Sequence, residues 1–295
     1  MNIDNQYYDI INQDIFNINA NINLSFEFFP PKNTVSSNNF FTAIEKLSIF
    51  HPKFISVTCT AEKNIHCDYT YNAIKKIPKI LQLNIAPHIT YINSSISEIK
   101  TLAKNYWNAG IRSIVALRGD VKDSYPKSPK VYAYELVSLL KDVADFDISV
   151  AAYPEAHPES KSAKHDLMYL KKKIDSGANR AITQFFFDAN QYLRFRDQCF
   201  GAGIYVDIIP GILPIINFKQ LKRFIKLTNV SIPKWMENIF NNLIDDPYIN
   251  KMVGLIISVN IIKKLCEEGV NNFHFYTLNH FDMVYSLCSI LKNPI

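Results

Sequence analysis

The sequence lacks the features that mark secreted and membrane-spanning proteins. Its five cysteines are scattered and include no C-x-x-C pair, which is typical of a reducing compartment without disulfides. The N-terminus carries Asp4, Asp9 and Asp14 where a secretory signal would have a basic region followed by an apolar one. Apolar stretches are interrupted well before the ~20 residues that span a bilayer. We therefore expect a cytoplasmic protein with no membrane partner.

The sequence also lacks a strong excess of either charge. It has 32 basic and 27 acidic residues without the dense basic stripe that binds nucleic acid, so we expect no nucleic-acid partner. The tightest basic run, residues 171–173, would by itself be a solvated helix face. His66 and Cys67 stand beside Asp68, but no second cluster has zinc-like spacing, and we expect no metal.

A recurring unit consists of an amphipathic segment, a glycine and a short β-branched or aromatic run. Gly110, Gly177, Gly203 and Gly269 stand where a helix ends in a left-handed residue before a strand. Similar runs without the glycine bring the predicted strands to about eight. They cover residues 24–30, 54–60, 85–90, 113–119, 149–154, 181–187, 205–210 and 273–279.

Helix-like segments separate the predicted strands. Ser95 and Glu98 have the spacing of a capping box, and Asp188 and Asn217 are predicted N-caps. Strands and helices in alternation, with apolar strands, are typical of a parallel sheet covered on both faces. We expect an α/β protein with a closed (β/α)8 TIM barrel. An open doubly wound sheet is less favoured because no strand is followed by a G-x-G-x-x-G turn.

The length of 295 residues would allow two domains, but such barrels are routinely single units. Because no Ser-, Gly- or Pro-rich linker divides the chain, we expect one domain over residues 1–295. Residues 1–22 are expected to form an N-terminal extension or helix. The interval between residues 217 and 269 predicts extra helices before the last strand, one of them starting near Pro233.

Polar residues gather at the predicted strand ends, where barrels of this kind carry out their chemistry. Glu27 is flanked by Phe26, Phe28 and Phe29, and apolar surroundings would raise the pKa of its carboxyl and suit a general acid. It could equally point to solvent or pair with a lysine. The other strand-end residues are Thr58, His88, Arg118, Asp120, Tyr153, His157 and Gln184.

Several of these residues have an alternative interpretation. Asp120 follows Gly119, a residue that lets a flat ring approach the backbone, and its carboxylate could accept two N–H groups of a heterocycle. It could equally cap the next helix. A lone His88 is more often a hydrogen-bonded core residue than a ligand. Tyr153 and His157 share a proline-punctuated loop that could be only a rigid turn.

Long motifs occur in order at the predicted strands: SFEFFPPK, FISVT, APHIT, GIRSIVALRGD, DISVAAYPEAHPES, GANRAITQFFFD, IIPGILPI and FHFYTLN. From about residue 22 to residue 290 they strongly resemble bacterial methylenetetrahydrofolate reductases of the short form, a catalytic barrel without a regulatory domain. The resemblance implies non-covalent FAD at the barrel rim, reduced by NADH or NADPH. Hydride would then pass to the methylene carbon of the folate in a ping-pong cycle. The product would supply methyl groups for methionine synthesis.

The resemblance also implies roles residue by residue. Glu27 matches the general acid, and Asp120 matches a carboxylate that faces both flavin and pterin. Positions that match the FAD site are Thr58, Cys59, Ala61, His88, Arg118, Gly119, Asp120, Ala133, Tyr153, His157, Asp166, Lys172 and Lys173. Positions that match the folate or nicotinamide site are Asp120, Gln184, Gln220, Phe224 and His280. The implied partners are small molecules, and the family suggests a homotetramer.

Four features depart from the family pattern. The loop after Thr58 lacks two expected arginines, Tyr169 stands for an asparagine, and Lys172 stands for an arginine. His280 stands where the family has an arginine for substrate binding, so we expect folate binding that weakens as the histidine loses its charge with rising pH. These departures leave open a degenerate barrel that binds folate or a partner without catalysis. A flavin barrel that oxidises a small amino acid is a third hypothesis.

Overall fold

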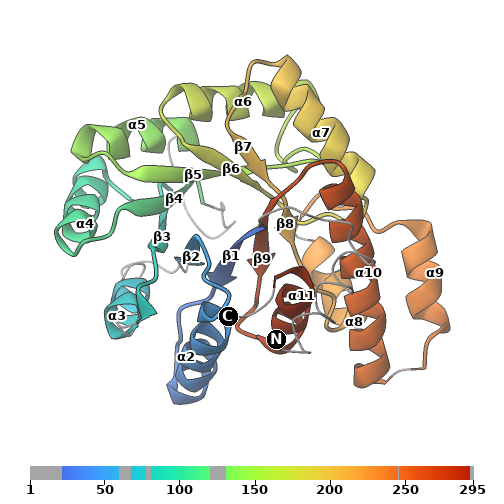
Figure 1. The fold of residues 1–295 in the computed structure, drawn as a ribbon. Helices are drawn as coiled ribbons and strands as arrows, with labels where there is room; N and C mark the ends of the chain where they lie inside the picture. The colour runs from blue at the N-terminus through green and yellow to red at the C-terminus, as the bar shows by residue number, and fades with distance from the viewer. Residues whose placement is uncertain are drawn as a thin grey trace, which may run out of the picture.

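The computed structural model describes residues 22–59, 68–77, 81–92, 94–119, 131–226, 228–244 and 246–292, which form a barrel of parallel strands ringed by helices (Figure 1). The strands are β1 (Asn23–Phe28), β2 (Phe54–Val57), β3 (Ile85–Thr90), β4 (Ser113–Leu117), β5 (Asp147–Ala152), β6 (Arg180–Thr183), β7 (Asp207–Ile209), β8 (Gly211–Ile212) and β9 (Asn272–Tyr276). The helices are α2 (Thr34–Ser48), α3 (Asp68–Lys76), α4 (Ile96–Asn108), α5 (Ala133–Val143), α6 (Ala163–Asp175), α7 (Ala189–Gly201), α8 (Phe218–Ile225), α9 (Lys234–Asn242), α10 (Pro247–Glu267) and α11 (Asp282–Leu291). The alternation confirms the predicted (β/α)8 TIM barrel.

The barrel is closed at Pro210, which separates β7, inside the predicted strand at residues 205–210, from β8, which lies just beyond that prediction. In the sheet order β7-β6-β5-β4-β3-β2-β1-β9-β8 these two short strands are the ends. β7 pairs with β6, and β8 pairs with β9. Pro210 itself has no N–H to donate, but its carbonyl accepts the backbone N–H of His274 at 3.0 Å. One residue between two strands thus joins the ends of the sheet.

Gly211 begins β8 at a place where no side chain fits. A Cβ at this position would lie 2.2 Å from the carbonyl oxygen of Thr183 and 2.6 Å from the ring of Tyr276. The Tyr276 hydroxyl donates to the same carbonyl at 2.8 Å. Glycine is therefore what allows β6, β8 and β9 to approach one another at the seam.

The helices begin and end where their capping residues predict. Ser95 caps α4 in a capping box with Glu98. The side chains of Asp188 and Asn217 accept backbone N–H groups in the first turns of α7 and α8. All four glycines predicted to end helices have positive φ. These four boundaries and three caps are confirmed.

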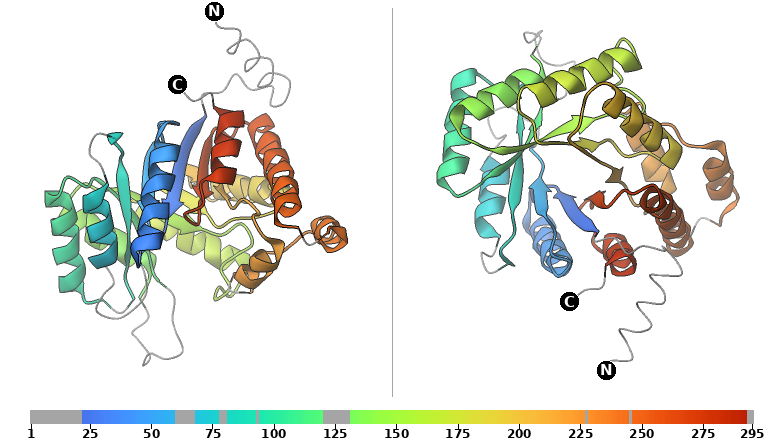
Figure 2. Two further views of the ribbon diagram at one scale, coloured as in Figure 1. Left: turned by 90° about the horizontal axis from the view of Figure 1, so that it is seen from below. Right: turned by 45° about the horizontal axis from the view of Figure 1, so that its top comes forward.

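The long interval before the last strand holds α8, α9 and α10, as predicted, and Figure 2 shows them grouped at one side of the barrel. Pro233 immediately precedes α9, and the stacked rings of Phe218 and Phe240, 4.3 Å apart, join α9 to α8. The extension predicted over residues 1–22 lies outside the described residues, except for Ile22. In the described part of the chain, no helix is long and apolar enough to cross a membrane.

Strand side chains alternate between the surrounding helices and the barrel interior. In β1, Phe26 and Phe28 pack outward, and the Phe28 ring lies 6.0 Å from that of Phe40 in α2. Ser25 and Glu27 point the other way and contact side chains of β9 and β3. The interior of this barrel therefore holds polar groups where branched apolar residues usually dominate.

An ion pair fills the interior at the N-terminal end of the strands. Arg180 of β6 donates to both carboxylate oxygens of Asp147 in β5, at 2.6 and 2.8 Å. The guanidinium lies 5.5 Å from the ring of Phe54, which stacks on His274 at 5.7 Å. The stacked rings of Phe54 and His274 thus separate the Arg180–Asp147 ion pair from the polar groups nearer the C-terminal end of the strands.

Candidate active site

Glu27 is held at a fixed position near the C-terminal end of β1. Its carbonyl accepts the Thr277 hydroxyl at 2.6 Å and the Thr277 N–H at 3.2 Å. Beyond it, the Phe29 N–H donates to the Asn279 side chain at 2.8 Å, and that side chain donates back to the Phe29 carbonyl at 2.9 Å. The carboxylate itself is 18% exposed and faces the barrel interior. The backbone around Glu27 is therefore fixed by the segment that follows β9.

Two buried imidazoles flank the Glu27 carboxylate. Oε2 lies 3.4 Å from Nε2 of His88 and 4.0 Å from Nε2 of His274. Among the described residues, neither Nε2 atom has a hydrogen-bond partner. Three titratable groups from β1, β3 and β9 thus meet at one carboxylate oxygen, an arrangement suited to moving a proton.

These neighbours set the charge of the carboxyl. Burial acts to raise the pKa of Glu27, but the contact with His274 and the charges of His88 and His274 outweigh it, and the pKa lies below its ordinary value. The expectation of a raised pKa is wrong, because the two histidines outweigh the effect of burial. Burial lowers the pKa of His88, with Glu27 opposing. In this state Glu27 is a proton acceptor at neutral pH.

Ser25 orients the second imidazole. Its hydroxyl lies 2.8 Å from Nδ1 of His274 and donates to the carbonyl of Phe273 at 3.2 Å. Because one hydroxyl proton cannot serve both contacts, the bond to Phe273 leaves Nδ1–H of His274 as the donor to Ser25. The other ring nitrogen, Nε2, faces Glu27.

Tyr276 forms a wall of the same interior. Its ring lies edge-on to His274 at 5.4 Å and to Phe185 at 6.4 Å. Burial raises its pKa well above the ordinary value, and the nearby Glu27 acts in the same direction. Tyr276 therefore stays protonated and keeps its hydrogen bond to Thr183.

A second polar group lies at the ends of β4 and β5. Arg118 donates to both carboxylate oxygens of Glu159, at 2.6 and 2.8 Å. The backbone N–H of His157 donates to Asp166 of α6 at 3.1 Å, and the Tyr153 ring lies 4.7 Å from the His157 ring. The structure thus brings four predicted cofactor-site residues together around one loop.

The three consecutive lysines of α6 have different environments. Lys171 pairs with Asp175, and Lys172 lies 5.1 Å from the ring of Tyr169. Lys173 is half-buried and donates to the carbonyl of Ala151 at 2.8 Å. Burial lowers the pKa of Lys173 to about 8. The run is therefore not a uniform solvated face.

The other predicted cofactor-site residues lie at neighbouring strand ends. The Thr58 N–H donates to the Phe28 carbonyl at 2.9 Å, Cys59 follows it half-buried, and Ala133 begins α5. Gly119 has φ +89°, and a Cβ there would meet the Ile92 side chain at 2.4 Å. Packing against Ile92 thus requires a glycine at this position. Ala61 and Asp120 lie outside the described residues.

The predicted substrate residues occupy the same end of the barrel. Gln184 follows β6 and accepts the Phe185 N–H at 3.1 Å. Gln220 and Phe224 of α8 line a small hollow together with Leu278, which follows β9. His280 is exposed, and its N–H donates to the Thr277 carbonyl at 2.8 Å. The loop before His280 is strained, since two consecutive non-glycine residues have φ of +49° and +59°.

Sequence reasoning did not identify Ser25, His274 and Tyr276 as site residues. A usable signal was present, because His274 sits between two phenylalanines in NFHFY as Glu27 does in SFEFF. The two strands pair in parallel, so that Ser25 lies opposite His274 and Glu27 opposite Tyr276. The sequence alone does not show that the first and last strands are neighbours in the barrel.

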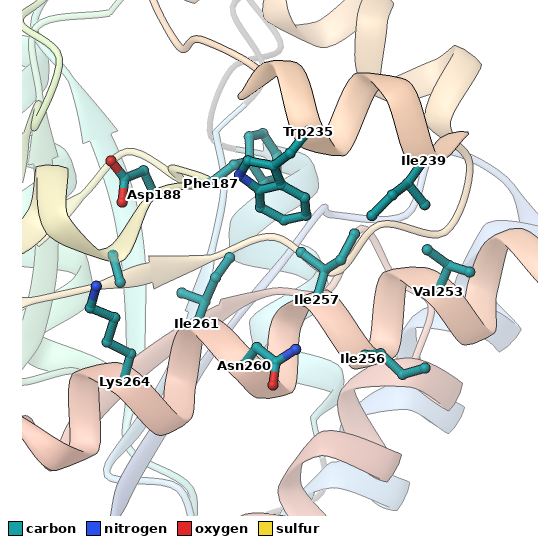
Figure 3. A pocket seen from close by; sticks show the side chains of 11 residues that line it. Phe187, Asp188, Trp235, Ile239, Val253, Ile256, Ile257, Asn260, Ile261 and Lys264 are labelled. Carbon is teal, nitrogen blue, oxygen red and sulfur yellow. The ribbon is translucent and has the colours of Figure 1, made fainter. Parts of the chain in front are cut away.

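A larger hollow of about 430 Å³ lies outside the barrel wall, between α9 and α10 (Figure 3). Trp235 and Ile239 line it from α9, Ile256 and Ile257 line it from α10, and Asp188 lies at one end. None of its lining residues is among the predicted site residues. The candidate active site therefore lies at the C-terminal end of the barrel interior, around Glu27.

Comparison with known proteins gives one consistent family. The family profile described as methylenetetrahydrofolate reductase matches residues 11–292. The 5,10-methylenetetrahydrofolate reductase of Buchnera aphidicola subsp. Schizaphis graminum is 55% identical, over 98% of each chain. That of Escherichia coli is 53% identical, over 96% of this chain and 95% of its own.

A solved structure from Clostridium thermocellum has the same fold, with a TM-score of 0.65 and 19% identity. The match covers 96% of this chain and 98% of that one, which is described as a protein that binds two copies of 5-methyl-5,6,7,8-tetrahydrofolic acid.

Proposed function

Because the chain belongs to the methylenetetrahydrofolate reductase family and shares its activity, we propose that it converts 5,10-methylenetetrahydrofolate to 5-methyltetrahydrofolate using FAD and NADH or NADPH. The observation that carries the proposal is Glu27 between two buried imidazoles at the C-terminal end of the barrel interior. The fold shared with a protein described as binding 5-methyltetrahydrofolic acid supports a folate in this barrel.

The chemistry of the β4 and β5 rim fits FAD. Arg118, Lys172 and Lys173 are cations that would attract the anionic pyrophosphate, with His157 beside them. Thr58, Cys59, His88, Gly119, Ala133, Tyr153 and Asp166 would line the remainder of the cofactor, and family resemblance adds Ala61 and Asp120. When bound, FAD supplies the hydride that it receives from the nicotinamide.

Glu27 would act as the proton donor to the folate as its five-membered ring opens. In the ligand-free protein its pKa is low, so Glu27 must gain a proton before it can act as an acid. Substrate entry removes water from the carboxylate, and this desolvation raises the pKa. His88, with Nε2 at 3.4 Å from Oε2, would approach to return that proton, and His274 would support the carboxylate from 4.0 Å. Ser25 keeps Nε2 of His274 directed at Glu27.

The folate would lie against residues from three elements. Gln184 follows β6, Gln220 and Phe224 lie on α8, and His280 follows β9. The amide groups of the glutamines can hydrogen-bond the pterin edge, and Phe224 offers an apolar surface to the substrate. His280 would supply a positive charge only in its protonated form. Asp120 would hold the amidine edge of the pterin, as the family resemblance implies.

We further propose that the enzyme works in the cytoplasm as a homotetramer and that its product supplies methyl groups for methionine synthesis. These points rest on the family resemblance. Light scattering of the purified protein gives the oligomeric state directly, and a monomer would contradict the tetramer.

The visible spectrum of the purified protein tests the central proposal. We expect a flavin band that NADH bleaches and that methylenetetrahydrofolate restores under anaerobic conditions. A colourless protein that binds folate would instead indicate a degenerate barrel. A flavin band that a small amino acid bleaches, and that methylenetetrahydrofolate does not restore, would indicate an amino-acid-oxidising flavoenzyme.

A further inference from the structure

One stretch of the sequence holds basic residues and no acidic ones. Between Asp207 and Glu237 there are five Lys or Arg residues and no Asp or Glu. Without these five, the 32 basic residues of the chain fall to 27, equal to the 27 acidic ones. The rest of the chain therefore has no net charge, and the excess of positive charge equals the charge of this segment, which contains α8.

Three of the five cations lie on one exposed face formed by α8 and its C-cap residue. Lys219, Arg223 and Lys226 follow one another at intervals of four and three residues, and all three are exposed; we call them the α8 stripe. Phe218 and Leu221 occupy the buried face. The helix thus separates an apolar face toward the protein from a cationic face toward solvent.

The remaining cation of α8 has a structural role. Lys222 pairs with Glu237 of α9 at 3.1 Å and lies 4.9 Å from the ring of Phe218. It therefore holds α9 against α8 and is not part of the stripe.

The α8 stripe lies beside the proposed folate site. Gln220 and Phe224 are on the same helix and line a hollow with Pro214 and Leu278. Asn217 caps the helix at the end of the barrel where β8 ends, accepting the Gln220 N–H at 3.0 Å. A folate held by Gln220 and Phe224 would therefore direct its anionic end toward cations of the stripe or toward open solvent.

We propose that the α8 stripe binds the oligo-γ-glutamate tail of the folate substrate, an inference that rests on the proposed function. Each added glutamate carries one carboxylate, and a γ-linked residue adds five backbone bonds, about 6 Å when extended. Four residues along an α-helix also span about 6 Å, so Lys219 and Arg223 match the spacing of successive carboxylates. The uniform charge of the segment adds long-range attraction for a polyanion.

The test compares substrates that differ only in the tail. The ratio of KM for methylenetetrahydrofolate with one glutamate to that with five is measured for the wild type. It is then measured for the triple variant Lys219→Gln, Arg223→Gln, Lys226→Gln. Three exposed ion pairs predict a wild-type ratio of about ten, which falls toward one in the triple variant. Added salt should lower the wild-type ratio in the same way.

A matched control removes three exposed lysines from α3 and α4, with Lys76→Gln, Lys100→Gln and Lys104→Gln. The ratio should stay at the wild-type value in this control. An equal loss of ratio in both triple variants would overturn the proposal, and so would a wild-type ratio near one. If the α8 triple variant fails to fold, as judged by circular dichroism, the single variant Arg223→Gln gives the answer by a smaller fall in ratio.

This outcome is separable from the proposed function. A wild-type protein that reduces the monoglutamate substrate without any preference for tail length refutes the α8 stripe alone. A protein that does not reduce either substrate with FAD and NADH or NADPH present refutes the proposed function.

Discussion

Ser25 and His274 are 249 residues apart in the chain, yet the Ser25 hydroxyl lies 2.8 Å from Nδ1 of the imidazole. The contact exists because β1 and β9 pair in parallel with these two residues directly opposite. The other ring nitrogen of His274 faces Glu27 at 4.0 Å. The protonation state of the proposed general acid therefore depends on a strand from the far end of the sequence.

The Glu27→Gln variant should separate the two halves of the reaction. Glutamine keeps the size of the side chain but cannot deliver a proton, so folate reduction should fall by about 10²- to 10⁴-fold. Reduction of the flavin by NADH should continue, and it serves as the internal control. Stopped-flow absorbance measures both steps. Normal folate turnover in this variant would remove Glu27 from the mechanism.

The Ser25→Ala variant should destabilise the protein and disturb the proton site together. Alanine leaves the buried Nδ1 of His274 without its partner, which costs about 1–3 kcal/mol of unfolding free energy. Urea denaturation measures this loss, and Ser138→Ala on the exposed face of α5 is the control, with a change within about 0.5 kcal/mol. The pH profile of folate reduction should also shift. An unchanged profile would mean that Ser25 does not act through His274.

FAD affinity should weaken as the pH rises through the range in which Lys173 titrates. Burial lowers the pKa of Lys173 to about 8, so the side chain is charged below that pH and neutral above it. The attraction for an anionic pyrophosphate is therefore present at low pH and lost at high pH, a change of about five-fold in Kd. Titration of flavin-free protein with FAD, followed by fluorescence, would show it. Lys173→Arg should give a flatter curve because arginine stays charged, and equal slopes in both proteins would contradict the assignment.

Two glycine substitutions should change the free energy of unfolding in opposite directions. Gly211→Ala places a Cβ 2.2 Å from the Thr183 carbonyl and should cost about 1–3 kcal/mol or open the barrel seam. Gly201→Ala, in α7, meets nothing within 4 Å and should stabilise the protein by about 0.5–1 kcal/mol. Thermal unfolding of the two variants measures both. A neutral Gly211→Ala would show that β8 can move away from β6 without cost.

The His280→Arg variant should bind the folate more tightly than the wild type. Arginine presents a permanent charge and parallel N–H donors to an anionic substrate, so the folate KM should fall several-fold. Steady-state KM values of the two proteins are the measurement. Equal values would exclude a contact between His280 and the substrate.

The helices and strands could be predicted because short local sequence patterns determine where they begin and end. Glycines after helices and the caps Ser95, Asp188 and Asn217 mark the boundaries, and each mark is a single-residue effect. Most strand ends were predicted too late along the chain, although β3 was predicted with its observed bounds: β1 ends at Phe28, and β6 ends at Thr183. The aromatic residues that follow these two strands have the composition of a strand, but they lie in loops at the end of the barrel. Side-chain composition alone therefore does not show where strand pairing stops.

The parts of the site that could not be predicted depend on long-range pairing. The charge of Glu27 is set by His88 and His274, and neither is near it in sequence. Pro210 marks an interruption of one strand position, but the pairing of β7 with β6 and of β8 with β9 depends on the closed barrel. Strand-end position identified Glu27, whereas its partners required the closed barrel.

The pairing of β1 with β9 has a consequence for synthesis of the protein. On the ribosome, Glu27 emerges early and has no imidazole from β9 beside it until almost the whole chain has been translated. A prematurely terminated product would carry the carboxylate and the cationic rim but lack His274. Such a fragment would also leave the edges of β1 and β8 without β9 between them, so the barrel closes only after the last strand has been translated.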